Sequence, residues 1–538
     1  MSTFDGLYIA KSGVQASQTG LNLTGHNISN AGTKGYTRQR IDQYAIPPRQ
    51  EGGRYAVSGA TYGQGVRTQD TTQIRDLFLD GEYRTQNAQY GESNLMDDVL
   101  SRLEDIFSTT TTSSSSSDYS VVDILSDQFS DLISQMERLV SGEDNASESA
   151  IYDSAKILAT KLNRAAKDME TTRTHQSDNL TSNVKSVNDL MRDIASLNEQ
   201  IEDATSNGSS ALELKDQRNL KLDELSQYVS IKVEPAATDG GITVYLANAD
   251  GTAATDADPT DSANQDKRYT LIDDGKYAKF TVTQDNQDED GSSFNKFDFT
   301  HIRLDGTDFA QNSDVKNADL KSGSFSGYLQ ILNESGEYDS PATSRGIGFY
   351  AQYLDAVAEK FASVMNWANS TNVEGSGYPN SPLFTSDGSA TITAGSAAIT
   401  AKNIQVSNGW SLTDSKNSAK EGDYSNITAM ITALASTKVD LTASGNKLFH
   451  GTIQAAFSNE TTMLGQDTAS VISSNVTSSN RLNTIDSERQ SESSVDINDE
   501  TINMIQYNKA LTASSRFMTA VDECLQTIIN NMGLAGRG

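Results

Sequence analysis

The C-terminal end of this chain carries an apolar residue at every seventh position, from Ile497 to Met532. A strict period of seven predicts a helix that winds around another helix in a left-handed supercoil. A second line of contact positions lies three residues after the first and includes Tyr507. The predicted contact face contains Met504, Leu511, Met518, Val521, Leu525 and Ile528. A helix with such a face needs a partner helix to cover it.

The N-terminal end repeats with the same period. Its apolar line consists of Leu7, Val14, Leu21 and Ile28. Its second line consists of the small residues Ala10, Ser17 and Thr24. Small residues let two helix backbones approach closely, although the glycines of this segment weaken its helicity by about 1 kcal/mol each. Taken alone, the segment reads as an ordinary amphipathic core helix, but the matching repeats favour pairing of the two ends.

The predicted pair is only marginally stable by itself. About a dozen large side chains contribute roughly 2 kcal/mol each when buried, whereas ordering about 65 residues costs ~1–2 kcal/mol apiece. Helical hydrogen bonding offsets part of the cost of ordering these residues, but neighbouring subunits are still needed to cover the pair. Residues 1–40 and 497–538 are therefore interpreted as one terminal coiled-coil domain that serves in assembly.

Composition excludes several classes of protein. The chain of 538 residues has 72 acidic and 42 basic residues and a net charge of −30, which argues against binding to nucleic acid or to an anionic membrane. Its single cysteine, Cys524, rules out an intrachain disulfide framework and a cysteine-based zinc site. No apolar run is long enough for a membrane span. The first residues lack a secretory signal pattern, so we expect a protein that stays in the cytosol or leaves without a cleaved signal.

The middle of the chain predicts a helical rod interrupted by two insertions. Residues 146–204 contain no glycine or proline, and a continuous helix of that length would extend about 90 Å. From residue 229 the period changes to two, which is typical of strands. The expected fold is mainly α with β-rich insertions. The predicted domains are a helical rod domain (41–230, 331–370 and 448–496), an inserted β-rich domain (231–330) and a small inserted α+β domain (371–447).

Finer elements are also predicted. Residues 70–107 and 121–140 have the spacing of amphipathic helices, and 109–117, which contain only Thr and Ser, read as a flexible connector. The β-rich insertion should face solvent and bury a core of its own.

Catalytic motifs are missing from the sequence. It has no nucleophile elbow, zinc-protease, phosphate-loop or dinucleotide signature, so neither catalytic nor cofactor-binding residues are predicted. A weak calcium candidate lies at Asn286, Asp288 and Asp290, followed by Gly291. The twelfth position of that loop would be Phe297, which cannot supply the bidentate carboxylate of an EF-hand. A solvated acidic turn is the simpler interpretation.

Residues 25–31, which read Gly-His-Asn-Ile-Ser-Asn-Ala, and residues 33–39, which read Thr-Lys-Gly-Tyr-Thr-Arg-Gln, resemble the N-terminal signature of bacterial flagellar rod, hook and hook-associated proteins. The Arg-Gln pair after Gly-Tyr-Thr and the Leu-x-Asp-Gln-Arg helix near residue 214 are more similar to the hook-associated protein 1 family than to the hook protein. Ser29 and Gly32 depart from the usual pattern with small residues. The resemblance covers roughly 1–235, 320–370 and 450–538, and implies assembly roles for Asn27, Asn30, Gly35 and Tyr36.

The resemblance implies a structural subunit, not an enzyme, in a ring between flagellar hook and filament. Its terminal helices would line the axial tube, and its insertions would face outward. It implies export through the flagellar type III channel and an extracellular location. The implied partners are the hook protein, hook-associated protein 3, copies of itself and a cytosolic export chaperone. The alternatives are an exported adhesin or secreted effector that functions through its insertions, and a flagellum-borne hydrolase.

Overall fold

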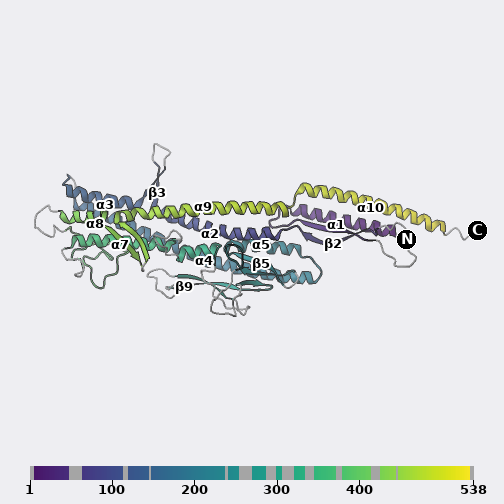
Figure 1. Cartoon of the computed structure of the whole chain (residues 1–538), viewed down its shortest axis with the longest axis horizontal. Coiled ribbons are helices and arrows are strands. Elements are labelled where there is room, and N and C mark those ends of the chain that lie inside the picture. The colour runs from purple at the N-terminus through teal and green to yellow at the C-terminus, as the bar shows by residue number, and fades with distance from the viewer. Residues whose placement is uncertain are drawn as a thin grey trace, which may run out of the picture.

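The computed structural model of this chain is elongated and mainly helical, with small sheets, and both termini lie at the same end (Figure 1). The residues that the structure describes are 5–47, 63–112, 119–143, 147–236, 240–253, 269–285, 299–305, 320–333, 345–370, 378–412, 424–443 and 446–532. The calcium candidate at Asn286, Asp288 and Asp290 lies outside them.

A terminal arm forms one end of the molecule. Helix α1 (Asp5–Asn30) lies beside α10 (Ile497–Met532), and the antiparallel strands β1 (Gln39–Ala45) and β2 (Val66–Gln73) pack against α1 (Figure 1). The sequence predicts helix from residue 70, but residues 70–73 belong to β2, because they pair with β1. The two ends of the chain are therefore brought together, as their matching repeats predict.

Long helices form the rod. Helix α4 (Glu148–Ser206) is continuous over 59 residues, which confirms the long helix predicted from 146–204. It lies along α5 (Leu212–Tyr228), whereas α2 (Leu77–Phe107) lies along both α5 and α9 (Ile453–Ser493). The rod is thus built from segments far apart in the sequence.

The far end of the rod is a helical bundle with an aromatic core. Helices α3 (Ile124–Ser141), α7 (Ile347–Asn369) and α8 (Ser425–Ala435) pack there with the first half of α9. The short strands β11 (Phe384–Thr385) and β12 (Gln405–Val406) pair at this end, as do β13 (Lys438–Ala443) and β14 (Asn446–Thr452). Phe129 and Phe457 stack with their ring centroids 4.7 Å apart. The predicted small insertion therefore contributes to the core of the bundle.

The β-rich segment packs against the second half of α4. One sheet has the order β5 (Ile231–Pro235), β6 (Ile242–Leu246), β7 (Thr270–Asp273), β8 (Lys276–Tyr277). A separate pair is formed by β9 (Lys279–Asp285) and β10 (Phe299–Asp305). Val244 and Phe280 from these strands are buried in the same cluster as Val187 and Met191 of α4 and Phe325 of α6 (Ser324–Asn333). The prediction of a solvent-facing insertion with its own core is therefore wrong, because the strands share the core of the rod.

The first part of the Thr/Ser-rich segment is not the flexible connector that the sequence predicts, whereas residues 113–117 lie outside the described residues. This first part forms strand β3 (Ser108–Thr112), which pairs with β4 (Tyr119–Asp123) in a hairpin before α3. The hairpin projects from the side of the rod (Figure 1). β-branched threonines favour extended backbone, which accounts for the strand.

Candidate assembly interface

Three glycines of α1 form its contact with α10. The contacting pairs are Gly6 with Val521, Gly13 with Ser514 and Gly20 with Tyr507. Each step of seven residues forward on α1 is a step of seven backward on α10, so the two helices are antiparallel. A methyl group added at Gly20 would lie 2.5 Å from a ring carbon of Tyr507. The helices thus approach so closely that a larger residue at Gly20 displaces the ring.

The small-residue side of α1, not its apolar line, is the most deeply buried. The buried residues of α1 are Ala10, Ala16, Ser17, Gly20, Thr24 and Asn27. The predicted contact residues Leu7, Val14, Leu21 and Ile28 are half-buried. Leu7, Val14 and Leu21 each follow a contacting glycine by one residue, about 100° around the helix. The prediction from the large residues missed these glycines as contacts. Their own recurrence at every seventh position was the available signal for the contact.

On α10 the predicted face is only partly covered. Leu511, Met518, Val521 and Leu525 are half-buried, whereas Met504 and Ile528 are 37% and 43% exposed. Other large apolar side chains of α10 are also exposed, namely Ile497, Ile502, Ile505, Phe517 and Ile529. The helix therefore presents apolar surface to its surroundings along most of its length.

The loop after α1 is closed by its own polar side chains. Asn27 Nδ2 donates to the carbonyl oxygen of Gln39 at 2.9 Å, and Asn27 Oδ1 accepts from the Tyr36 hydroxyl at 2.7 Å. Asn30 accepts from the Thr33 hydroxyl. Gly35 has a φ of +81°, which favours glycine. These signature residues are brought together within one subunit.

Burial raises the pKa of Tyr36 above its ordinary value, and the nearby carboxylates of Asp216, Glu213 and Glu500 add to this effect. The phenol therefore remains protonated and can donate to Asn27.

A cluster of charged and polar residues joins the terminal arm to the rod. We call it the joint cluster and define it as Thr37, Arg38, Arg75, Asp216 and Glu500. The Asp216 carboxylate of α5 accepts from the Thr37 amide at 3.1 Å and from the Thr37 hydroxyl at 2.6 Å. Arg38 Nε lies 2.8 Å from Oε1 of Glu500, which is 2% exposed. Arg75 donates to the Thr37 hydroxyl at 3.1 Å. The joint cluster thus links α5, α10 and the start of α2 through the loop after α1.

A second group of ion pairs lies next to the joint cluster on the rod. Asp223 of α5 accepts from Arg84 of α2 at 2.9 Å and from Arg489 of α9 at 2.6 Å. The guanidinium of Arg489 also lies 3.9 Å from the ring centroid of Tyr83. Buried charges of this kind are tolerated when they are paired. Three rod helices are therefore held in register just beside the arm.

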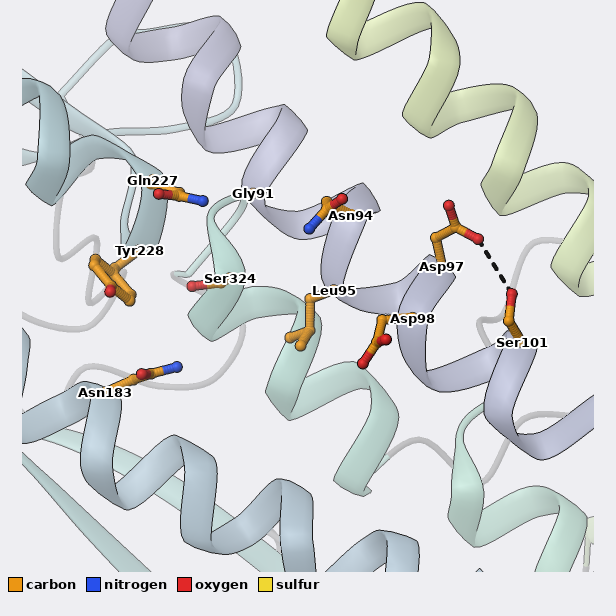
Figure 2. A pocket seen from close by; sticks show the side chains of 10 residues that line it. All are labelled: Gly91, Asn94, Leu95, Asp97, Asp98, Ser101, Asn183, Gln227, Tyr228 and Ser324. Carbon is orange, nitrogen blue, oxygen red and sulfur yellow. Dashed lines mark hydrogen bonds between the residues drawn. The ribbon is translucent and has the colours of Figure 1, made fainter.

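A groove of about 590 Å³ lies between α2, α4, the end of α5 and α6, with Asn94, Asp98 and Tyr228 among its lining residues (Figure 2). Its carboxylates already have partners inside the chain. Asp97 accepts from Ser101 and Asn475, and Asp98 is paired with Arg102 at 3.0 Å. Both carboxylates that line the groove are therefore paired with side chains of the same chain.

The described residues contain no group of three or more side chains that could hold a metal ion. Among the described helices, none combines the length and the apolar character needed to span a membrane.

Two family models match the chain. Residues 100–384, more than half of the sequence, match the flagellar hook-associated protein FlgK helical domain. Residues 487–532, which include α10, match the C-terminal region of flagellar basal body rod FlgEFG proteins.

Two individual proteins and one solved structure are similar to this chain over different lengths. Flagellar hook-associated protein 1 of Bacillus subtilis (strain 168) is 28% identical over 550 residues, which covers 100% of both chains. The protein of the same name from Escherichia coli (strain K12) is 24% identical over 43% of this chain and 40% of its own. The solved structure of the flagellar hook junction protein FlgK from Burkholderia pseudomallei superimposes with a TM-score of 0.52 at 13% identity and covers 76% of this chain and 100% of its own. The last likeness concerns the fold alone.

Proposed function

This chain belongs to the flagellar hook-associated protein FlgK family, and from that premise we propose that it forms the junction between hook and filament by polymerising through its terminal helices. Membership makes it a structural component of the flagellum with partners among the hook and filament proteins. The specific partners we propose are the hook protein, hook-associated protein 3 and further copies of this chain.

We also propose that the chain is exported by the flagellar type III system, without a cleaved signal, and reaches an extracellular position on the flagellum. A cytosolic export chaperone would hold its C-terminal part before export.

The observation that carries the proposal is the exposed apolar surface of α10. Ile502, Ile505 and Ile529 are 53%, 50% and 67% exposed in the single chain. Fully burying an isoleucine side chain contributes roughly 1.5–3 kcal/mol, so covering the exposed half of each contributes roughly 1–2 kcal/mol. Exposed apolar surface of this extent is typical of a binding site. Neighbouring subunits that cover α10 would supply this burial.

The signature residues support the proposal in a different way from the terminal helices. Asn27, Asn30, Gly35 and Tyr36 make their described contacts within the subunit. We propose that they set the orientation of α1 and α10 relative to the rod. A subunit with a fixed arm would offer α10 to its neighbours at one angle.

Fractionation tests the proposed location. Cell-free hook–filament structures are purified from a strain that produces a tagged chain, and the culture supernatant is kept. The tagged chain should remain with the hook–filament fraction and localise to its junction by immunogold labelling. A freely secreted effector would instead be found in the supernatant. Labelling along the filament, or none on it, contradicts the proposed position.

A further inference from the structure

Glu460 is a carboxylic acid in the core of the helical bundle. It lies on α9 and is 1% exposed. Its neighbours along the helix, Phe457 and Leu464, belong to the apolar core. Its Oε1 atom has no hydrogen-bond partner among the described residues. An ionised carboxylate in such a place would be costly.

The titratable groups that act on Glu460 from the surrounding elements do not supply a positive charge. Asp123, at the start of α3, acts on the Glu460 carboxyl group, and Glu460 in turn acts on the Tyr350 hydroxyl of α7. Asp123 caps α3 by accepting from the Leu125 and Ser126 amides, at 3.1 Å and 3.0 Å.

Two cations near these elements are paired with other groups. Arg345 lies 3.2 Å from Asp467, which also accepts from the Tyr350 hydroxyl. Lys161 of α4 donates to the carbonyl oxygen of Ile124. Within the described part of the chain, Glu460 therefore has a carboxylate neighbour and no cationic partner.

We propose that Glu460 is a proton-linked weak point of the helical bundle: the bundle binds a proton there when it folds and releases it when it unfolds. Burial in the core, and then the Asp123 carboxylate, raise the pKa of Glu460 well above its ordinary value. An unfolded glutamate ionises near pH 4.3. Between that pH and the raised folded value, only the folded chain holds the proton. Unfolding is then favoured as pH rises, and the bundle is most stable in mild acid.

The chain contains a built-in probe of this region. Its two tryptophans, Trp367 and Trp410, both belong to the bundle, on α7 and beside the core. Intrinsic fluorescence therefore reports on the part of the molecule that contains Glu460, in the full-length protein.

The test compares urea unfolding of the full chain with that of Glu460→Gln, from about pH 5 to about pH 8. The control is Glu359→Gln, which changes an exposed glutamate on α7 of the same bundle. One proton released on unfolding raises the unfolding equilibrium constant up to tenfold per pH unit. The unfolding equilibrium constants of wild type and of Glu359→Gln should both rise in this way with pH. The unfolding equilibrium constant of Glu460→Gln should rise less, by up to tenfold per pH unit.

Asp123→Asn provides a second readout that does not touch Glu460. Asparagine still caps a helix, but the neighbouring negative charge is lost. Without this charge the pKa of Glu460 in the folded chain is lower. The loss of stability with rising pH should therefore end at a lower pH than in wild type. Equal pH slopes for wild type and Glu460→Gln, or a wild-type bundle that becomes more stable from pH 5 to pH 8 relative to that variant, overturn the proposal.

A consequence for export rests on the proposed function, because a chain that passes through a channel unfolded must first lose this bundle. Glu460→Gln should then be exported more slowly than Glu359→Gln. Equal export rates of the two variants would contradict a role of Glu460 in export. The proposed position at the junction is tested separately, by the immunogold labelling.

Discussion

Thr37 and Asp216 are 179 residues apart in the sequence, and both the amide and the hydroxyl of Thr37 donate to the Asp216 carboxylate. Each residue lies in a short motif, Gly-Tyr-Thr after α1 and Asp-Gln-Arg on α5. The contact connects the two motifs and fastens the loop after α1 to the rod. Because the loop is also bound to α1 through Asn27, the contact fixes the terminal arm as well.

Replacing Asp216 by Asn should loosen the terminal arm. An amide has one acceptor atom, so one of the two hydrogen bonds from Thr37 is lost in a buried place, at a cost of about 1–3 kcal/mol. Hydrogen exchange of residues 31–39 should accelerate in the purified variant, with no change in the tryptophan-monitored unfolding of the bundle. Asp153→Asn, at an exposed position of α4, is the control. Unchanged exchange in Asp216→Asn would show that the contact does not hold the loop.

Gly20→Ala should separate α1 from α10. The added methyl group would lie 2.5 Å from the Tyr507 ring, and relieving such overpacking costs about 1–3 kcal/mol. We expect faster hydrogen exchange in α1 and reduced motility when the variant is the only copy in the cell. Gly25→Ala is matched, because nothing lies within 4 Å of its added methyl group and alanine favours helix by about 1 kcal/mol. A motile Gly20→Ala strain with normal exchange in α1 contradicts the close contact.

Ile505→Asp tests the outer surface of α10. The side chain is 50% exposed, so the single chain should keep its unfolding curve. If neighbouring subunits cover this position, an unpaired carboxylate there costs several kcal/mol and assembly should fail, with the variant recovered in the medium. Ile505→Leu preserves the apolar area and should assemble. Normal filaments on Ile505→Asp would place the assembly surface elsewhere.

Removing the β-rich segment should damage the rod. Replacing residues 234–321 by a short Gly/Ser linker removes Val244 and Phe280 from the cluster that covers Leu180, Val187 and Met191 of α4. Each uncovered side chain loses roughly 2 kcal/mol of burial, so the variant should aggregate or unfold at lower urea. The milder control shortens only residues 286–298, which lie between β9 and β10. If the large deletion unfolds like the control, the strands are not needed by the rod.

The sequence predicts the helical parts well because their signals are local. The absence of glycine and proline through α4 and the repeats of α1 and α10 depend only on nearby residues. Which face of α1 packs depends instead on how closely α10 approaches. Leu7 and Val14 suggested a large-residue contact, whereas the structure packs Gly6 and Gly13 against α10. An apolar period thus predicts that a helix has a partner, but not which line of residues meets it.

Long-range polar contacts could not be predicted in the same way. Nothing near Thr37 in the sequence indicates Asp216, and nothing near Glu500 indicates Arg38. The two family motifs were the only available signal, and the resemblance assigned the residues of the first motif to contacts with other subunits. Likewise, the alternation of the strands predicts one buried face, but it does not say that the face lies on α4. These contacts exist only once the chain has folded back along its length.

The described chain passes between the terminal arm and the rod at residues 74–76 and 494–496, and the loop at residues 31–38 within the arm is bound to the rod through Asp216. None of them is helical, and backbone hydrogen bonds tie them together, from the Arg38 amide to the Ser493 carbonyl and from the Ile74 amide to the Arg38 carbonyl. One flexible connection would let the arm rotate about the long axis, but three linked connections oppose that rotation. A twist applied to α1 and α10 is therefore transmitted to the rod.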